Sequence, residues 1–234
     1  MLPLMLICSR DAEFCLMLQH IFKADGFESG MAETVQEAVQ RVESVDVSAV
    51  ILDCQPDSGL ALAICREIKS SKTAGSIPIV AFIMPGCGNR HLGLLKAGVD
   101  QAFARPIAPE LYLAYLHSIV SSHQGEKPEL EDGNIISIGK INILADKYRV
   151  QRKDGKDIHL SPIEFRLLCK MSRLPGQVFS REELIRAAWP DNIFVELRTV
   201  DVHIGRLRRL LLQELGIDLI RTVRSAGYAM EVAA

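Results

Sequence analysis

The sequence predicts a doubly wound parallel α/β sheet followed by a smaller α+β domain, and three observations support this. In the first half, short apolar runs alternate with segments whose apolar residues recur at helical spacing. This alternation is typical of βαβ units and therefore of a parallel sheet with helices on both faces. A polar segment interrupts the pattern at 123–133. The second half then combines period-two alternation, three helical segments and a terminal hairpin.

The elements of the first half follow from their apolar patterns and their ends. Residues 11–24 predict a helix that ends at Gly26, and a later helix ends at Gly98. The last helix of this half carries Pro109 in its first turn, where proline is tolerated. The apolar runs that predict strands are LPLMLIC, SAVILD, IPIVAFI and QAFARP.

The second half opens with residues 134–160, where alternation broken by turns predicts a small antiparallel sheet. Three helices follow, in SPIEFRLLCKMSRLPG, in SREELIRAAWP and in ELRTVDVHIGRLRRLLLQELG. Ser180 and Glu183 stand at capping-box spacing at the start of the second of these helices. We therefore predict a domain over 1–122, a linker at 123–133 and a domain over 134–234.

The amino-acid composition narrows the classes of protein to which the chain can belong. The chain has 234 residues, 48% hydrophobic and 24% charged, which is ordinary for a globular protein. No apolar run reaches a membrane span and the first residues do not read as a signal peptide, so we expect a cytoplasmic protein. The cysteines form no CxxC or metal-spaced pair, which favours reduced core thiols. They stand at positions 8, 15, 54, 65, 87 and 169.

Charge is distributed unevenly between the two halves. Residues 1–123 carry 9 Lys and Arg against 13 Asp and Glu, a net charge of −4, whereas residues 124–234 carry 18 against 16, a net charge of +2. The segment from Arg198 to Arg209 holds four arginines and one acid. A local basic stripe of this kind points to nucleic acid more directly than total charge does.

The motifs LSPIEFRLLCKMSRLPGQVFSREELIRAAWPD, RTVDVHIGRLRRLL and IRTVRSAGYAM resemble the winged-helix effector domain of the OmpR/PhoB family of response regulators. The resemblance implies a recognition helix from about Leu197 to Leu212 in the major groove of double-stranded DNA. Arg206 would face base edges and Arg224 would enter the minor groove. Gly205 departs from the family, which often has a basic residue there, so one phosphate contact is expected to be missing. The other residues expected at the DNA are Trp189, Arg198, Thr199, His203, Arg208, Arg209, Thr222 and Tyr228.

The first half resembles the receiver domain of the same family, a flavodoxin-like sheet, through AVILD, KADGF, IPIVAF, KAGVD and Arg105-Pro106. The family's function implies phosphoryl transfer from a histidine kinase to Asp53, aided by Mg²⁺. However, the acidic pair that would hold the metal reads Ser9 and Arg10, with Asp11 one position later. The family's hydroxyl residue and lysine are replaced by the residues Ile83 and Arg105.

These substitutions lead us to expect no Mg²⁺ cofactor and an internal ion pair in its place. We predict that Arg10 pairs with Asp53, with Arg105 as a second candidate partner, since an ion pair about 4 Å apart gains about 4 kcal/mol of Coulomb energy at an effective dielectric constant near 20. In the alternative, Asp53 is a poor phosphoacceptor that uses Asp11 to hold the metal.

The last helix of the first half offers a candidate dimer face, because the charges that the resemblance implies there read Leu111, Tyr115 and His117. Tyr112 and Tyr115 lie three residues apart and can share one helix face, so the candidate face consists of Leu111, Tyr112 and Tyr115. Two interpretations remain open. The two tyrosines cover the sheet as core residues, or they form an apolar homodimer interface.

The leading interpretation is a sequence-specific DNA-binding transcription regulator that does not require phosphorylation, forms homodimers and acts on RNA polymerase. The altered pocket argues against a histidine kinase as partner. One alternative is a conventional regulator switched by phosphorylation of Asp53. Another is a redox or small-ligand sensor that uses Cys8, Cys54 and Cys87, which would lie near the carboxyl end of the sheet. No constellation of catalytic residues or metal ligands supports an enzyme.

Overall fold

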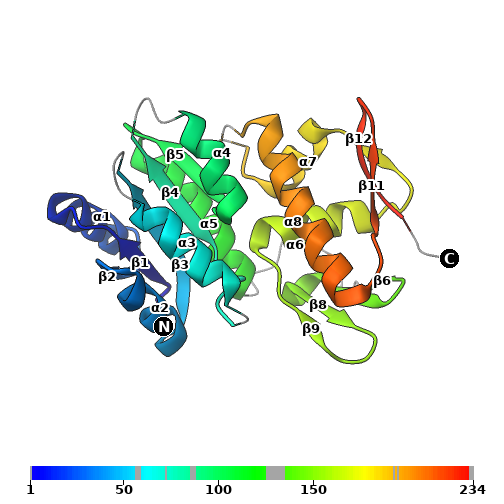
Figure 1. Cartoon of the computed structure of the whole chain (residues 1–234), viewed down its shortest axis with the longest axis horizontal. Coiled ribbons are helices and arrows are strands. Elements are labelled where there is room, and N and C mark those ends of the chain that lie inside the picture. The colour runs from blue at the N-terminus through cyan, green and yellow to red at the C-terminus, as the bar shows by residue number, and fades with distance from the viewer. Residues whose placement is uncertain are drawn as a thin grey trace. The chain divides into compact units, whose positions relative to one another are not determined.

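The computed structural model describes residues 2–55, 59–71, 73–84, 88–124, 135–191, 193 and 195–231 (Figure 1). The chain divides into two compact units, residues 1–120 and 121–234. Most of the predicted linker at 123–133 lies outside the described residues.

The first unit contains a five-stranded parallel sheet with strand order β2-β1-β3-β4-β5. The predicted doubly wound parallel sheet is therefore confirmed. Every residue of β3 except one is buried, as expected for a central strand covered on both faces. The strands are β1 (Leu4–Cys8), β2 (Glu28–Ala32), β3 (Val47–Cys54), β4 (Ile79–Ile83) and β5 (Gln101–Ala104).

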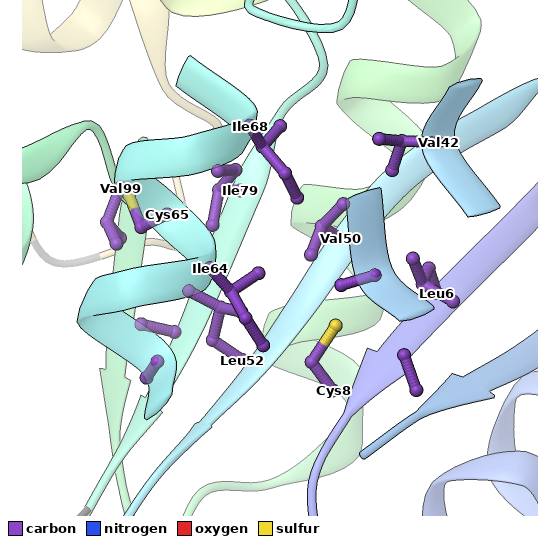
Figure 2. Close-up of a cluster of buried hydrophobic side chains, with 14 of the residues drawn as sticks. Leu6, Cys8, Val42, Val50, Leu52, Ile64, Cys65, Ile68, Ile79 and Val99 are labelled. Carbon is purple, nitrogen blue, oxygen red and sulfur yellow. The ribbon is translucent and has the colours of Figure 1, made fainter. Parts of the chain in front are cut away.

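Five helices cover the two faces of this sheet. They are α1 (Ala12–Ala24), α2 (Val35–Ser44), α3 (Leu60–Ser70), α4 (Gly88–Ala97) and α5 (Pro109–Gln124). Figure 2 shows one face, where Ile64 and Ile68 of α3 and Val42 of α2 pack against Val50 and Leu6 of the central strands. The opposite face is covered by α1 and α5, whose rings meet at Phe22 and Tyr112.

A buried ion pair between Lys69 and Asp100 holds α3 against the sheet of this unit. The Asp100 Oδ2 atom accepts a hydrogen bond from the Lys69 Nζ of α3 at 3.0 Å and another from the backbone N–H of Ile79 at 2.9 Å. Asp100 has no exposed surface, so the paired lysine compensates a charge that water cannot reach. The pair therefore ties α3 to the start of β4 and to the turn before β5.

The second unit contains two antiparallel sheets and three helices (Figure 1). A four-stranded sheet runs in the order β6-β7-β8-β9, and a three-stranded sheet has the order β10-β12-β11. The predicted small antiparallel sheet, three helices and terminal hairpin are all present. The elements are β6 (Ile135–Ile138), β7 (Ile141–Leu144), the 3₁₀ turn η1 (Ala145–Lys147), β8 (Arg149–Arg152), β9 (Asp157–Ile158), α6 (Pro162–Ser172), β10 (Val178–Phe179), α7 (Arg181–Ala188), α8 (Leu197–Leu215), β11 (Ile220–Val223) and β12 (Gly227–Met230).

Local sequence signals set the helices of this unit. Ser180 and Glu183 form the predicted capping box at the start of α7, with the Ser180 N–H donating to the Glu183 carboxylate at 2.7 Å. The longest helix, α8, has no basic residue in its last turn. Instead, the Arg152 guanidinium of β8 donates to the carbonyl of Glu214 at 2.8 Å, which supplies the positive charge that a helix C-terminus favours.

Candidate functional site

The acid singled out by the sequence, Asp53, lies near the carboxyl end of β3, with its side chain only 1% exposed. Its Oδ2 atom accepts a hydrogen bond from the Ser9 hydroxyl at 2.5 Å and another from the Gln55 amide at 3.0 Å. Its Oδ1 atom accepts from the Arg105 guanidinium at 2.7 Å. Both carboxylate oxygens therefore already have donors from within the chain.

The cation beside Asp53 is held by aromatic rings as well as by charge. The guanidinium carbon of Arg105 lies 3.8 Å from the centroid of the Phe14 ring and 5.9 Å from that of Phe82. A guanidinium stacked on an aromatic face gains cation–π attraction while it remains free to donate in its own plane. Phe14, which the sequence did not single out, therefore supports the arginine that neutralises Asp53.

The predicted pairing of Arg10 with Asp53 is wrong, and the second candidate, Arg105, takes its place. Arg10 is exposed, and its Nε–H donates to the carbonyl of Glu33 at 3.2 Å. Both residues follow β1, which ends at Cys8, and the chain bends at Arg10. Ser9 contacts Asp53, whereas the Arg10 side chain is directed to the carbonyl of Glu33.

The remaining altered positions have structural roles. Asp11 caps α1, since its Oδ1 accepts from the backbone N–H of Phe14 at 3.1 Å. Its own N–H donates to the Ser9 hydroxyl at 3.0 Å. Ile83 is buried at the end of β4, opposite Cys54 in the sheet register. Ile83 therefore supplies no hydroxyl at the end of β4, and the carboxylate of Asp11 is engaged as a helix cap.

These residues do not fit a magnesium ion. Mg²⁺ requires octahedral oxygen ligands, including one or more free carboxylates. Here Asp53 faces a guanidinium and Asp11 is engaged as a helix cap. Within the described part of the chain, no group of three His, Cys, Asp or Glu residues could hold a metal ion.

The cysteines proposed for redox sensing are poor candidates where the structure describes them. Cys8 is 2% exposed, its Sγ lies within the core cluster of Figure 2, and burial raises its pKa to about 12. Cys54 is also buried, and its thiol donates to the carbonyl of Leu52. Because the thiolate is the reactive form, the raised pKa of Cys8 makes its thiol a weak nucleophile. Cys87 lies outside the described residues.

The candidate dimer face on α5 is wrong for its two tyrosines. Tyr112 and Tyr115 are 2% and 0% exposed, so they are core residues, the first of the two interpretations. Tyr112 packs edge-on against Phe82 and Phe22, at centroid distances of 5.0 and 6.4 Å, and Tyr115 against Phe103 at 5.9 Å. Both tyrosine rings pack into the aromatic cluster of the core. Of the three residues predicted for this face, Leu111 alone is exposed.

The candidate recognition helix α8 has one buried and one outward face. Its buried stripe includes Val200, Ile204, Leu207 and Leu211. On the outward face, Arg198 and Arg209 are exposed, and Arg206 is half-buried beside them. A Cβ atom built on Gly205 meets nothing within 4 Å, so the middle of this face is open space. Arg198 and Arg209 form no ion pair with any described residue, which leaves their charges available for phosphates.

The hairpin β11–β12 carries the candidate wing residue. Arg224 is exposed in the turn between the strands, where Ser225 adopts a positive φ of 62°. Gly227 follows with φ of 145°, and a Cβ there would lie 1.9 Å from the carbonyl oxygen of Phe179. Only glycine can occupy this position without moving the backbone. The hairpin is therefore held closely against the strand β10.

Two further expected DNA residues brace α8 against the hairpin. The Arg208 guanidinium donates to the carbonyl of Ile220 at 2.5 and 3.1 Å and to the Thr222 hydroxyl at 3.0 Å. Arg208 also pairs with Asp218 at 3.2 Å. Arg208 and Thr222 are therefore hydrogen-bonded to each other, and a phosphate would have to compete for the same donor groups.

A second brace was not anticipated from the sequence. Asp201 of α8 accepts hydrogen bonds from the Arg181 Nε and from the Tyr228 hydroxyl, both at 2.7 Å. Burial and the Asp201 carboxylate raise the pKa of Tyr228, so this hydroxyl stays protonated as a donor. Asp201 therefore joins Arg181 of α7 to Tyr228 of the hairpin. The motif SREEL predicts that Arg181 lies at the start of a helix, but it does not indicate the partner of Arg181.

Three other expected DNA contacts are buried by the packing of α7 against α8. Trp189, at the end of α7, lies edge-on to the His203 ring at a centroid distance of 5.4 Å. Trp189 and Thr199 are 4% and 3% exposed, which leaves little surface for a phosphate. His203 has no exposed surface, so a DNA contact by its side chain is contradicted.

Comparisons with known proteins identify the family. The family model described as "Transcriptional regulatory protein, C terminal" matches residues 155–230. Over 231 residues, the chain is 30% identical to the phosphate regulon transcriptional regulatory protein PhoB of Rhizobium meliloti (strain 1021), covering 99% of this chain and 100% of that protein. The chain belongs to the OmpR/PhoB family of response regulators. It is also 27% identical over 224 residues to PhoB of Escherichia coli (strain K12), with 95% of each chain covered.

The fold agrees with that of a solved structure. A mutant of the protein RitR superposes with a TM-score of 0.72 at 19% identity, covering 99% of this chain and 100% of that one. This OmpR/PhoB-family protein is therefore a DNA-binding transcriptional regulator with a receiver domain and a winged-helix domain, and it is not an enzyme. Among the helices described, none is both long and apolar enough to cross a membrane.

Proposed function

We propose that this protein is a sequence-specific transcription regulator whose receiver domain works without phosphorylation. The observation that supports the proposal is the occupation of both Asp53 oxygens by Ser9, Gln55 and Arg105. A phosphoacceptor must present a carboxylate oxygen in line with an incoming phosphoryl group and beside a metal ion. Here that oxygen is buried, and a fixed guanidinium stands beside it.

The energetics favour the ion pair over exchange for a metal. Removal of Arg105 from Asp53 would leave a buried, unpaired carboxylate, a change that typically costs 3–5 kcal/mol. A magnesium ion would have to displace the guanidinium, give up part of its water shell and find further acids that the pocket lacks. In this proposal the pocket therefore has a single state, in which Asp53 and Arg105 are paired.

The DNA-binding mode follows from the outward face of α8 and the wing. We propose that Arg206 reads base edges in the major groove, where a guanidinium can bind guanine through two parallel hydrogen bonds. Arg198 and Arg209 hold phosphates, and Arg224 enters the adjacent minor groove. The bonds of Asp201 to Tyr228 and of Arg208 to Ile220 support this mode, because they fix α8 relative to the wing.

The proposed partners are double-stranded DNA, a second copy of the chain and RNA polymerase. Two copies on neighbouring half-sites would recognise repeats about one helical turn apart. A conventional kinase-driven switch is the second candidate, and one observation favours it, namely that Asp53 itself is retained at the end of β3.

Phosphorylation by a small donor distinguishes the two candidates. The full-length chain is incubated with acetyl phosphate and Mg²⁺ and examined by intact mass spectrometry. We expect no phosphoryl adduct, whereas a stoichiometric adduct that disappears in Asp53→Asn would overturn the proposal. A positive control is the variant Ser9→Asp/Arg10→Asp/Arg105→Lys, which restores the family's acids and lysine and should gain both Mg²⁺ affinity and the adduct.

Selection of bound fragments from genomic DNA tests the DNA-binding mode. Against the selected site, Arg206→Ala should relax specificity at one base pair and cost about 1–3 kcal/mol, whereas Arg209→Ala should weaken all sequences equally and reduce the salt slope by about one. Arg149→Ala is the matched control, because Arg149 pairs with Asp157 in the other sheet of the same unit. Equal losses for all three variants would contradict the assigned roles.

A further inference from the structure

Three side chains from three elements of the second unit contact one another at Asp201. The Oδ1 atom of Asp201 on α8 accepts hydrogen bonds from the Arg181 Nε at the start of α7 and from the Tyr228 hydroxyl on β12, both at 2.7 Å. The guanidinium carbon of Arg181 also lies 5.3 Å from the centroid of the Tyr228 ring. Each side chain therefore contacts the other two, and we call residues 181, 201 and 228 the Asp201 triad.

Asp201 is the one acid in the basic segment of α8 from Arg198 to Arg209. It follows Arg198 by three residues and precedes Gly205 by four, and both spacings place neighbouring side chains on one face of a helix. A carboxylate on this face repels the phosphates that the arginines attract. On a helix that enters the major groove, such an acid lowers the affinity for any DNA unless it has a second role.

The ion pair of the Asp201 triad is accessible from outside the domain. The side chains of Arg181 and Asp201 are 28% and 37% exposed, so a DNA phosphate can approach both of them. An ion pair this exposed contributes little to stability by itself. Without the carboxylate, Arg181 would be one more cation beside α8. Because nonspecific binding consists almost entirely of phosphate contacts, an arginine held by a carboxylate lowers the affinity for DNA of any sequence.

The same carboxylate joins the recognition helix to the wing. Tyr228 belongs to β12, which pairs with β11, and Arg224 lies in the turn between these two strands. The bond from Tyr228 to Asp201 therefore fixes α8 relative to the turn that carries Arg224. Base contacts in the major groove and a wing contact in the minor groove require both elements in place at once. Loss of this bond would weaken binding to the correct site, while phosphate contacts to other DNA would remain.

We propose that Asp201 is a specificity-determining residue that withholds Arg181 from DNA phosphates and positions the wing through Tyr228. The inference rests on the proposed placement of α8 in the major groove, and it identifies a residue that separates the correct site from other DNA. Asp201 differs in this from Arg206 and Arg209. Its removal shifts the affinities for specific and nonspecific DNA in opposite directions, whereas removal of an arginine that binds DNA weakens binding.

Titrations of the full-length chain with two labelled duplexes test the proposal. One duplex carries the site selected from genomic DNA, and the other carries a scrambled site of the same length and composition. Asp201→Ala should bind the scrambled duplex about threefold more tightly, with the magnitude of the salt slope increased by about one. It should bind the selected site about threefold more weakly, so that the specificity ratio falls about tenfold. Weaker binding to both duplexes without a steeper salt slope is the result of simple destabilisation, and it would overturn the proposal.

Two further variants separate the two roles of Asp201. The double variant Arg181→Ala/Asp201→Ala should return the scrambled-site affinity and the salt slope to the wild-type values, while the selected-site affinity stays low. Asp201→Asn removes the charge but keeps an oxygen that can accept a hydrogen bond from Tyr228. It should therefore bind the scrambled duplex more tightly and the selected site more tightly than Asp201→Ala does. If the double variant keeps the raised scrambled-site affinity, Arg181 is not the withheld cation and the proposal fails.

A matched control comes from an equivalent ion pair in the other sheet of the same unit. Asp157→Ala releases Arg149 by the same chemical change, and it should alter neither affinity. Arg206→Ala distinguishes a failure of this inference from a failure of the proposed DNA-binding mode. If Arg206→Ala keeps full specificity, the placement of α8 is wrong. If Arg206→Ala relaxes specificity but Asp201→Ala leaves the specificity ratio unchanged, the inference about Asp201 alone is overturned.

Discussion

At the scale of single residues, the ion pair between Asp53 and Arg105 carries much of the stability of its pocket. Arg105→Ala removes the cation from a carboxylate that is 1% exposed, and a buried charge without its partner is strongly destabilising. We expect the free energy of unfolding of the full chain to fall by about 3 kcal/mol in urea titrations.

The control replaces both partners together. Asp53→Leu/Arg105→Met removes the two charges at similar volume, and such a change is often neutral in a buried pair. The double variant should therefore be more stable than Arg105→Ala alone. A double variant that loses as much as the sum of the two single variants would show that the two groups act independently.

A second residue-scale prediction concerns alkaline pH. Burial, with Glu110 and Asp25 nearby, raises the pKa of Tyr112 to about 12, whereas an unfolded tyrosine titrates near 10. The stabilisation is therefore complete below pH 10 and is lost as the pH rises towards 12, because the unfolded state releases its proton first. Compared with Tyr112→Phe, the wild type should lose about 1 kcal/mol of its unfolding free energy between pH 10 and pH 11. Denaturant titrations at both pH values measure this difference, and an equal pH dependence of the two proteins would contradict it.

The comparison of Arg10 with Arg105 shows what sequence reasoning could and could not reach at this scale. The absence of the acidic pair and the presence of a guanidinium beside Asp53 followed from residue types alone. The choice of arginine required the direction of each side chain. The direction of Arg10 depends on the bend that follows β1, and the stacking of Arg105 on Phe14 joins residues about 90 positions apart, so neither leaves a local signal in the sequence.

At the scale of elements, substitutions of Gly205 in α8 test how the outward face of this helix approaches DNA. Gly205 lies in the interior of the helix on the open outward face, where glycine costs about 1 kcal/mol relative to alanine. Gly205→Ala should therefore raise the unfolding free energy by about 0.5–1 kcal/mol. Gly205→Lys should in addition tighten DNA binding at low salt and increase the magnitude of the salt slope by about one, through one added phosphate contact.

Titration of labelled duplex DNA at several salt concentrations measures that slope. Gly227→Ala provides the contrasting case, since its Cβ would collide with the carbonyl of Phe179 and destabilise the wing. If Gly205→Lys raised stability but left the salt slope unchanged, the centre of this face of α8 would not approach a phosphate.

The element α5 illustrates a limit of periodicity. The spacing of Tyr112 and Tyr115 correctly indicates that both lie on one helix face, but it cannot say whether that face meets the sheet or water. Large aromatic residues gain most from burial, and the rings of Phe22, Phe82 and Phe103 were available on neighbouring elements. The same reasoning applies to Trp189 and His203, whose edge-on contact joins α7 to α8.

At the scale of the whole molecule, the two units have distinct tasks that the change of sequence pattern already indicated. Parallel-sheet alternation gives way to antiparallel alternation and helices, and the chain separates into units on either side of residue 120. What the sequence could not convey is which apolar side chains stay outside the core, because exposure depends on how every helix packs. Leu16 and Met17 of α1 are examples, since both are exposed although they stand in an apolar part of the helix.

The geometry of two DNA-bound copies provides the last prediction. Two half-sites one helical turn apart lie on the same side of the duplex, so contacts between receiver domains can add to the affinity of the pair. Insertion of half a turn between them should abolish the cooperativity of the wild type while each half-site is still bound. On the correctly spaced pair, Asp53→Asn should bind with the same cooperativity as the wild type, because the proposed regulator does not use phosphorylation of Asp53. Footprint titrations of both duplexes measure these differences, and cooperativity that is lost in Asp53→Asn would show that the acidic pocket controls the contact between the two copies.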